Sequence, residues 1–343
     1  MQNFDLAEFI DILLCETSST RQLSESLDSF SEVCSQISGI KAESCFDAWA
    51  KDSYLATGLA ISPEAAANCV SDYKRSVVFI RAAYQAIKAS QSKFTHSKIK
   101  VLYAGCGPFA TQILPLLVKF TAKDLQLTFI DMHQESLDSV KLILNFFQLN
   151  EYDIQLEVDD ACLYQPNEQQ HVIITETMQK AIEQEPQYQI TKNLAPFLIS
   201  GGIFIPEKIQ ITLCLIDATK ERETYEQFQL LDSDELILQK KRYYIGNVLC
   251  LEANKLDNKI PAIPYKQSCG TFKLPDEEHL ENFDLVFMTQ IQIYKKYQLN
   301  EYESDLTLPA FCSGLPPLKQ RMKLAICYIV DSYPKFKVSL LKS

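Results

Sequence analysis

The pattern of apolar and polar positions divides the chain into three parts. In residues 1–98 the apolar positions recur at helical spacing. The first such set is Phe4, Leu6, Phe9, Ile10, Leu13 and Leu14, and a weaker helix is expected in the Ser-rich stretch 18–38. Ser62 and Pro63 form a helix start, with Ser as the N-cap and Pro at the first helical position. We expect that helix to continue to about Lys88.

The second part, residues 99–205, alternates short apolar runs with helical segments. The expected strands lie near Val101, Thr128, Gln155, Val172 and Ile203. Strands that alternate with helices form a parallel sheet with helices on both of its faces. This part is therefore predicted to be a Rossmann-like α/β domain.

The third part, residues 206–343, loses this alternation. Its apolar, β-branched or alternating runs cover residues 209–216, 235–239, 243–251, 284–294 and 322–330. Clusters of Pro, Asn and Asp separate them, and most have no amphipathic helix between them. The pattern is typical of an antiparallel β domain, a barrel or a sandwich. The predicted fold class is thus an α/β sheet domain with an N-terminal helical segment and a C-terminal barrel-like β domain.

Composition excludes several classes of protein. The net charge is −11 and there is no long basic run, which argues against a nucleic-acid partner. The eleven cysteines include no C-x-x-C pair, so we expect reduced thiols in a cytoplasmic protein. The four histidines are not spaced as ligand pairs, which predicts no metal site. No apolar run approaches ~18 residues, and the N-terminus lacks a basic region, so neither a membrane span nor a signal peptide is expected.

The first strand of the α/β part ends in a glycine turn. The apolar run 101–104 leads into Gly105-Cys-Gly107, and a helix is expected over 110–120. Glycine has no Cβ, so a ligand can approach this backbone, and free N–H groups at a helix start can hold an anion. A second apolar run, 125–130, ends in Asp131, whose carboxylate could accept two hydrogen bonds from ribose hydroxyls. Together these features predict a nucleoside-binding half-domain.

The region from Asp72 to Pro206 resembles the class I S-adenosylmethionine (SAM) methyltransferases, and within them the protein arginine methyltransferase group. The resemblance rests on the order and spacing of several elements rather than on one motif. They are Asp72-Tyr-Lys-Arg-Ser76, the glycine turn, Asp131, Asp159-Asp160, Ile173-Ile-Thr-Glu176, Glu185 and the stretch from Leu194 to Pro206. The family's architecture is a helical front, a SAM-binding sheet and a C-terminal β domain.

The resemblance implies a set of cofactor contacts. Arg75 would bind the methionine carboxylate of SAM with its fork of donors. Gly105 and Gly107 would let the backbone pass close to the cofactor, and Asp131 would bind the ribose. Asp160 and the backbone of Ala161 would lie near the adenine amino group.

Three of these positions have plain alternatives. Arg75 could be a surface arginine paired with Asp72 or with solvent, and Asp131 could be a helix N-cap. Which of Asp159 and Asp160 points inward is open.

Glu176 and Glu185 carry the substrate hypothesis. A guanidinium has a pKa above ~12 and delocalised lone pairs, so it is a poor nucleophile until it is held. Two carboxylates can grip its N–H groups and leave one nitrogen aimed at the methyl group, as a pair of glutamates does in the resembled family. The alternatives are a structural ion pair at Glu176 and a solvated helix face formed by Glu183 and Glu185.

The chain departs from the family in four places. Tyr103 stands where the glycine motif has an acid, and Phe109 occupies its last glycine position. Residues 177–180, Thr-Met-Gln-Lys, replace the aromatic–glycine pair after the first glutamate. No Thr-His-Trp, which in the family helps to wall the arginine channel, exists in the β part.

The function we predict from these residues is SAM-dependent N-methylation of a small guanidine or amine, such as free arginine. The first alternative is methylation of arginine in a protein. The others are an O- or C-methyltransferase of a natural product and an inactive SAM-fold scaffold. The expected partners are thus SAM and a small-molecule substrate, and self-association as a homodimer is left open.

Overall fold

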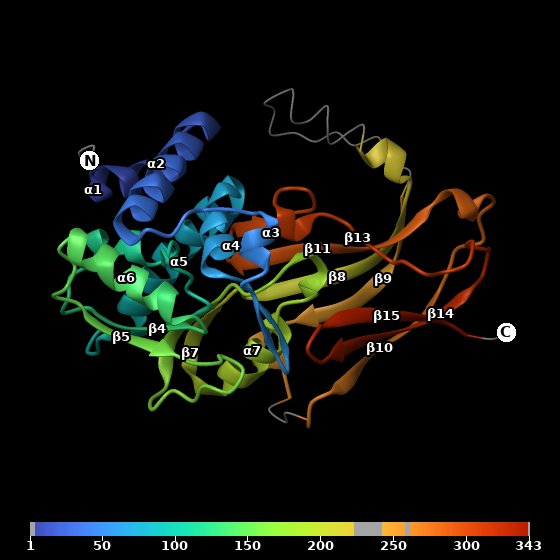
Figure 1. Cartoon of the computed structure of the whole chain (residues 1–343). Coiled ribbons are helices and arrows are strands. Elements are labelled where there is room, and N and C mark those ends of the chain that lie inside the picture. The colour runs from blue at the N-terminus through green and yellow to red at the C-terminus, as the bar shows by residue number, and fades with distance from the viewer. Residues whose placement is uncertain (1–3, 223–241, 258–260, 342–343) are drawn as a thin grey trace.

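The computed structural model describes residues 4–222, 242–257 and 261–341. Its helices and strands form three successive parts along the chain (Figure 1). The N-terminal part contains α1 (Leu6–Leu14), α2 (Thr20–Ser38), α3 (Phe46–Trp49), β1 (Ser53–Leu55), β2 (Gly58–Ala60), α4 (Pro63–Asn68), the 3₁₀ helix η1 (Cys69–Ser71) and α5 (Tyr73–Lys93).

Local capping explains where the N-terminal helices begin. Ser19 and Gln22 form a capping box at α2, and the Ser62 side chain accepts a hydrogen bond from the Ala65 N–H with Pro63 at the first helical position. The single helix expected from Ser62 to Lys88 is, however, two helices. Asp72 leaves helical geometry, with φ −78° and ψ 82°, and its carboxylate caps α5 through the Arg75 N–H. The break puts Arg75 in the first turn of α5.

A β-hairpin interrupts the N-terminal part, for which only helices were predicted. Strands β1 and β2 pair antiparallel, with Ser53 opposite Ala60 and Leu55 opposite Gly58. Strands of three residues are too short to show a period in the sequence. The signal was Gly58 directly after the turn at residues 56–57, because glycine is the residue best suited to the φ of +150° at position 58.

The central part is a parallel five-stranded sheet of order β5-β4-β3-β6-β7. Its strands are β3 (Ile99–Ala104), β4 (Leu125–Asp131), β5 (Asp153–Val158), β6 (Gln170–Thr175) and β7 (Leu198–Ile205), one at each of the five predicted places. The chain fills one side of β3 with β4 and β5, and then returns to fill the other side with β6 and β7. The carboxyl ends of β3 and β6 are the point where this order reverses, which is where open α/β sheets bind ligands.

Helices cover both faces of this sheet, as the strand–helix alternation predicts. Val101 and Tyr103 pack in one core with α5 and with α6 (Gln134–Phe146). The neighbouring Leu102 and Ala104 belong to a second core with α7 (Gln187–Leu194). Successive residues of a strand point to opposite faces, so α7 lies on the face opposite α5 and α6.

The segment after the glycine turn is not the expected α-helix over 110–120. It is a series of turns that leads into the 3₁₀ helix η2 (Leu114–Lys119). Ala110 has a φ of +42°, and Pro115 would lie inside an α-helix that began at Ala110, without an N–H to donate. The anion site expected at the start of a regular helix is therefore absent from this segment.

The C-terminal part is antiparallel β structure. It contains β8 (Lys208–Ile216), β9 (Arg242–Leu251), β10 (Tyr265–Lys273), β11 (Asp284–Tyr294), β12 (Tyr297–Leu299), β13 (Ala310–Phe311), β14 (Lys323–Val330) and β15 (Lys335–Leu340). One sheet has the order β12-β11-β8-β9, with β13 beside β11, and the other has the order β10-β14-β15. The ladders of the described residues do not close these sheets into one barrel. The predicted run 235–239 lies outside the described residues.

The 3₁₀ helices η3 (Lys180–Ile182), η4 (Ala195–Phe197), η5 (Ala253–Lys255), η6 (Leu280–Asn282) and η7 (Asp305–Thr307) occupy connections. Within the described ranges, no helix has the length and apolar character needed to cross a membrane.

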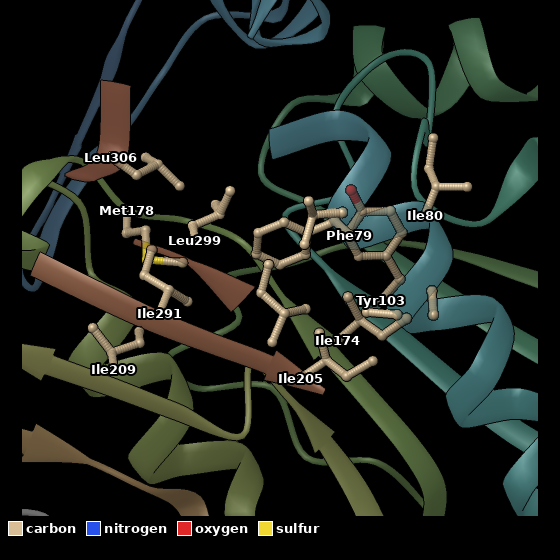
Figure 2. Close-up of a cluster of buried hydrophobic side chains, with 14 of the residues drawn as sticks. Phe79, Ile80, Tyr103, Ile174, Met178, Ile205, Ile209, Ile291, Leu299 and Leu306 are labelled. Carbon is tan, nitrogen blue, oxygen red and sulfur yellow. The ribbon is translucent and has the colours of Figure 1, made fainter. Parts of the chain in front are cut away.

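A buried apolar cluster joins the central and C-terminal parts (Figure 2). It brings Phe79 of α5 and Ile174 of β6 together with Ile209 of β8 and Ile291 of β11. Met178, two residues after Glu176, is buried in the same cluster and fixes the start of the segment that follows β6.

Candidate functional site

A pocket lies at the carboxyl ends of β3, β4, β5 and β6. The eight residues singled out in the sequence all line it: Arg75, Gly105, Gly107, Asp131, Asp160, Ala161, Glu176 and Glu185. The N-terminal part supplies its remaining wall through the hairpin, α4, η1 and the start of α5. Among the described residues, none after Ile190 lines this pocket, so the C-terminal part supports the site from outside it.

The glycine turn forms the floor of the pocket. Gly105 and Gly107 have φ values of +71° and +63°, which L side chains rarely adopt. A Cβ on Gly105 would lie 2.2 Å from Thr177 Cγ2, so the turn and the segment after β6 touch only because position 105 is glycine. The same Cβ on Gly107 would meet only Ala66 Cβ, at 3.6 Å.

Asp131 is buried at the tip of β4 and bonded to the glycine turn. Its Oδ2 accepts a hydrogen bond from the Gly107 N–H at 2.9 Å, and its Oδ1 accepts one from the His133 N–H at 2.9 Å. Helix α6 takes His133 as its N-cap, so Asp131 is not the helix cap considered above. A carboxylate has about four acceptor positions, which leaves Asp131 able to accept from a diol as well.

The two acids after β5 both line the pocket, with different exposure. Asp160 is partly buried and its Oδ1 accepts from the Cys162 N–H at 2.8 Å, whereas Asp159 is exposed and accepts from the Asp160 N–H at 2.7 Å. Ala161 is buried between these contacts. The backbone of this loop is thus held by its own carboxylates.

Arg75 and Glu176 form an ion pair inside the pocket, between Nη2 and Oε2. Only 12 % of the Arg75 side chain and 6 % of the Glu176 side chain are exposed, so Arg75 is not a surface arginine. The other carboxylate oxygen, Glu176 Oε1, is buried and has no hydrogen-bond partner. A buried acceptor without a partner is costly, and a ligand N–H would satisfy it.

Glu185 lies in the same pocket on a segment that is not a regular helix. Ala181, Ile182 and Gln184 have left-handed φ values, and the chain turns so that Glu185 is 7 % exposed. Glu183 points the other way and its Oε1 accepts from the Phe336 N–H at 3.2 Å. The two glutamates therefore do not form the solvated helix face considered above. Burial raises the pKa of Glu185 to about 7, against the opposing effect of Arg75.

A buried glutamine that the sequence analysis missed holds the segment around Glu176. Gln187 Oε1 accepts hydrogen bonds from both the backbone N–H and the hydroxyl of Thr177, each at 3.0 Å. Gln187 Nε2 donates to Thr175 Oγ1 at 2.7 Å and to Thr191 Oγ1 at 3.1 Å. One amide thus fixes both neighbours of Glu176 to α7. No spacing or motif in the sequence indicates such a role for a glutamine.

The residues that depart from the family motif pack as apolar lining. Tyr103 is buried with its ring edge-on to Phe129, at 6.1 Å between centroids, and Phe109 is buried beside the glycine turn. Both line the pocket. Over the described part of the chain, no three His, Cys, Asp or Glu side chains are grouped to hold a metal ion.

No family model and no curated protein sequence matches the chain. Among solved structures, it is similar to Arabidopsis thaliana protein arginine methyltransferase 10, captured in an open conformation. The identity is 11 %, the match covers 80 % of this chain and 97 % of that one, and the TM-score is 0.50. It also matches the Trypanosoma brucei PRMT1 enzyme–prozyme heterotetrameric complex with AdoHcy, at 10 % identity, 80 % and 96 % coverage and a TM-score of 0.48. The Arabidopsis match confirms the predicted fold class: a Rossmann-like parallel sheet followed by an antiparallel β domain.

Proposed function

We propose that this chain is a SAM-dependent methyltransferase that methylates a guanidinium nitrogen. The observation that carries the proposal is the meeting, in one pocket, of the Asp131–glycine turn with two buried carboxylates, Glu176 and Glu185. One of those carboxylates has a buried oxygen without a partner. The likeness of the fold to an arginine methyltransferase supports it further.

The residues fit the cofactor at both of its ends. Asp131 keeps acceptor positions for a ribose diol, and the backbone at Gly107 is open, since a Cβ there would meet only Ala66 Cβ at 3.6 Å. Arg75 uses Nη2 for Glu176 and has further N–H groups that could bind the carboxylate of the amino-acid end. When bound, SAM would supply an electrophilic methyl group on a sulfonium.

The two carboxylates then act on the acceptor. Glu176 Oε1 and the carboxylate of Glu185 accept N–H groups of the guanidinium and hold one nitrogen in line with the methyl group. They stabilise the positive charge of the guanidinium. The nitrogen that accepts the methyl group would bring a second positive charge to the guanidinium, which is removed when that nitrogen loses a proton, so the methylated product is again a singly charged cation. Glu185, with its raised pKa, is the group suited to receive that proton.

Two acceptors are consistent with this grip. Arginine carried by a protein is favoured by the likeness of the fold to the Arabidopsis arginine methyltransferase. A small guanidine or amine such as free arginine is the second candidate, because the sequence lacks the Thr-His-Trp that helps to wall the arginine channel in that family. We give the protein substrate priority, since it agrees with the whole fold rather than with one missing motif.

A methyl-transfer assay tests the proposal. It compares an arginine-rich peptide, free arginine, amines and phenols, with calorimetry of SAM binding in parallel. Glu176→Gln and Glu185→Gln should each reduce turnover by tenfold or more and leave SAM affinity nearly unchanged, with Glu183→Gln as the matched control. The double variant should be about as impaired as the worse single one, because the pair acts as a unit.

The outcomes separate the alternatives. Turnover of free arginine but not of peptide would select the small-molecule substrate. A preference for phenols, or full activity in Glu176→Gln, would reject guanidinium methylation. If the wild-type protein bound neither SAM nor S-adenosylhomocysteine, the methyltransferase proposal would be rejected in favour of the inactive scaffold. Asp131→Ala is the matching cofactor variant, with an affinity loss of at least roughly tenfold.

A further inference from the structure

The hairpin β1–β2, residues 53–60, forms a wall of the pocket although it belongs to the N-terminal part. Leu55, Leu59 and Ala60 line the pocket from the hairpin, and Ile61 follows directly. Tyr54, the cross-strand partner of Leu59, is 73 % exposed. Leu55 and Ala60 lie on one face of the hairpin and Leu59 on the other, so residues of both faces contribute to the pocket wall.

Side chains of the hairpin contact two of the loops that carry predicted cofactor residues. At its start, Ser53 Oγ is 3.0 Å from Nε2 of His133, which follows Asp131 by two residues and donates its own N–H to that carboxylate. At its tip, the buried Thr57 hydroxyl donates to Cys162 Sγ at 3.1 Å, next to Ala161. These contacts lie at the ends of β4 and β5, which is the nucleoside end of the pocket.

A backbone contact joins the same hairpin to the acidic segment. The Leu59 N–H donates to the Gln184 carbonyl at 2.8 Å, immediately before Glu185. Gly58 makes this approach possible, because a Cβ there would lie 2.9 Å from Gln184 O and from Pro186. The hairpin thus spans the pocket from the nucleoside end to Glu185.

Two strands of three residues are not stable by themselves in water. The position of this hairpin consequently depends on its few contacts with the loops, each of which can open without disturbing the sheet. An element that covers a ligand and is held by a few separate hydrogen bonds has the properties of a lid.

We propose that the hairpin 53–60 is the cover of the cofactor pocket, and that the Ser53–His133 hydrogen bond is the contact that keeps it closed over the nucleoside. Ser53, Thr57 and His133 are then positioning residues, which set how long the cofactor or its product stays bound. The inference rests on the proposed function, because it takes the nucleoside to be that of SAM.

The test measures the dissociation rate of S-adenosylhomocysteine from the full chain by displacement in stopped flow. Ser53→Ala should dissociate about five to ten times faster than wild type, and Thr57→Val should change in the same direction. Tyr54→Ala, which removes an exposed side chain of the same strand that does not line the pocket, should stay within twofold of wild type. Ser53→Ala should also raise KM for SAM without lowering kcat, since opening the cover faster does not disturb the carboxylates.

The results discriminate between a cover and a purely structural hairpin. Equal dissociation rates in wild type, Ser53→Ala and Thr57→Val would overturn the inference while leaving the methyltransferase proposal intact. A fall in kcat and in thermal stability with no change in dissociation rate would also overturn it. Wild-type protein that binds neither SAM nor S-adenosylhomocysteine would reject the proposed function and this inference together.

Discussion

At the scale of single residues, the ionisation of Glu185 is the property with the clearest functional consequence. Burial raises the pKa of Glu185 to about 7, and only the deprotonated form can grip a cation. The rate constant kcat/KM should therefore rise with pH through about 7 and then level off. The Glu185→Gln variant should turn over slowly, and its kcat/KM should not rise with pH in this range. A pH–rate profile of both proteins checks this, and a flat wild-type profile would contradict the role of Glu185.

The same shift predicts a pH dependence of stability. The pKa of Glu185 is about 7 in the folded chain, above the ordinary value of 4.5, so between these values the folded state binds more protons than the unfolded state. The free energy of unfolding should accordingly fall as pH rises through this window. Glu185→Gln removes the effect and should be more stable than wild type at about pH 8, with the difference shrinking below about pH 5. Urea unfolding at both pH values measures it, with the exposed Glu151→Gln as a control that should follow wild type.

Gly105 offers a test of the close contact at the floor of the pocket. Gly105→Ala puts a Cβ 2.2 Å from Thr177 Cγ2 and strains a φ of +71°, so it should weaken SAM binding by tenfold or more. Thr177→Ser removes that methyl group and keeps the hydroxyl that Gln187 accepts. The double variant should recover part of the affinity in calorimetry. Equal losses in Gly105→Ala and in the double variant would mean that backbone strain alone is responsible.

At the scale of elements, the segment after β6 depends on α7 for its position. Gln187→Leu keeps the volume of the side chain and removes the bonds to Thr175 and Thr177. Glu176 would then lose its alignment, and a small misplacement of a catalytic group can cost up to about a hundredfold in rate. We expect kcat to fall tenfold or more with SAM affinity changed little.

The matched control for this variant lies on the same helix. Gln189 is also buried, and its Oε1 accepts from the Tyr265 hydroxyl rather than from the segment around Glu176. Gln189→Leu should keep kcat within a few-fold of wild type. If both variants lost activity equally, α7 as a whole, and not the Gln187 amide, would position Glu176.

The strands that the sequence predicted in the parallel sheet are long enough to show a run or an alternation of apolar residues. Every residue of β6 is buried and its centre, residues 172–174, is an apolar run, whereas the exposed or half-buried β5 alternates polar and apolar residues. The hairpin 53–60 and the 3₁₀ helix after the glycine turn are short and are shaped by contacts with distant residues. Strand β15 begins by alternating lysine with apolar residues and strand β10 is mostly polar, so both lack an apolar run and were missed.

The lining of the site was predictable for a related reason. Carboxyl ends of parallel strands meet at one edge of a sheet, so residues that follow β3, β4, β5 and β6 had to converge. The functional roles of these residues stay predictions. What the sequence could not indicate is the supporting contacts, such as Gln187 to Thr177 or Ser53 to His133, because each joins residues whose approach depends on the complete fold.

At the scale of the whole molecule, the three parts of the sequence share one apolar core. The same cluster contains Phe9 of α1, Val101 of β3 and Tyr328 of β14. A hydrogen bond also joins the N-terminal and C-terminal parts. The Asp72 carboxylate, which caps α5, accepts from the Ser304 hydroxyl at 2.6 Å. The division of the chain into three domains at residues 98 and 205 remains a prediction, and this continuity of the core argues that they unfold together.

Joint unfolding can be tested by a cavity in the shared core. Ile291 of β11 is buried in the cluster that reaches α5 (Figure 2), so Ile291→Ala should destabilise the chain by about 2–5 kcal/mol. If the parts unfold together, hydrogen exchange should show slow amides of α5 and of β11 losing the same protection free energy.

Met288→Ala is the matched control, because Met288 lies on the same strand but in a separate small cluster with Cys214 and Val286. It too should lower α5 protection under joint unfolding, in proportion to its own loss of stability. If the protection of α5 were unchanged in both variants, the β domain would unfold on its own. A cavity in β11 can lower the protection of a helix in the N-terminal part only through an unfolding event that is common to both parts.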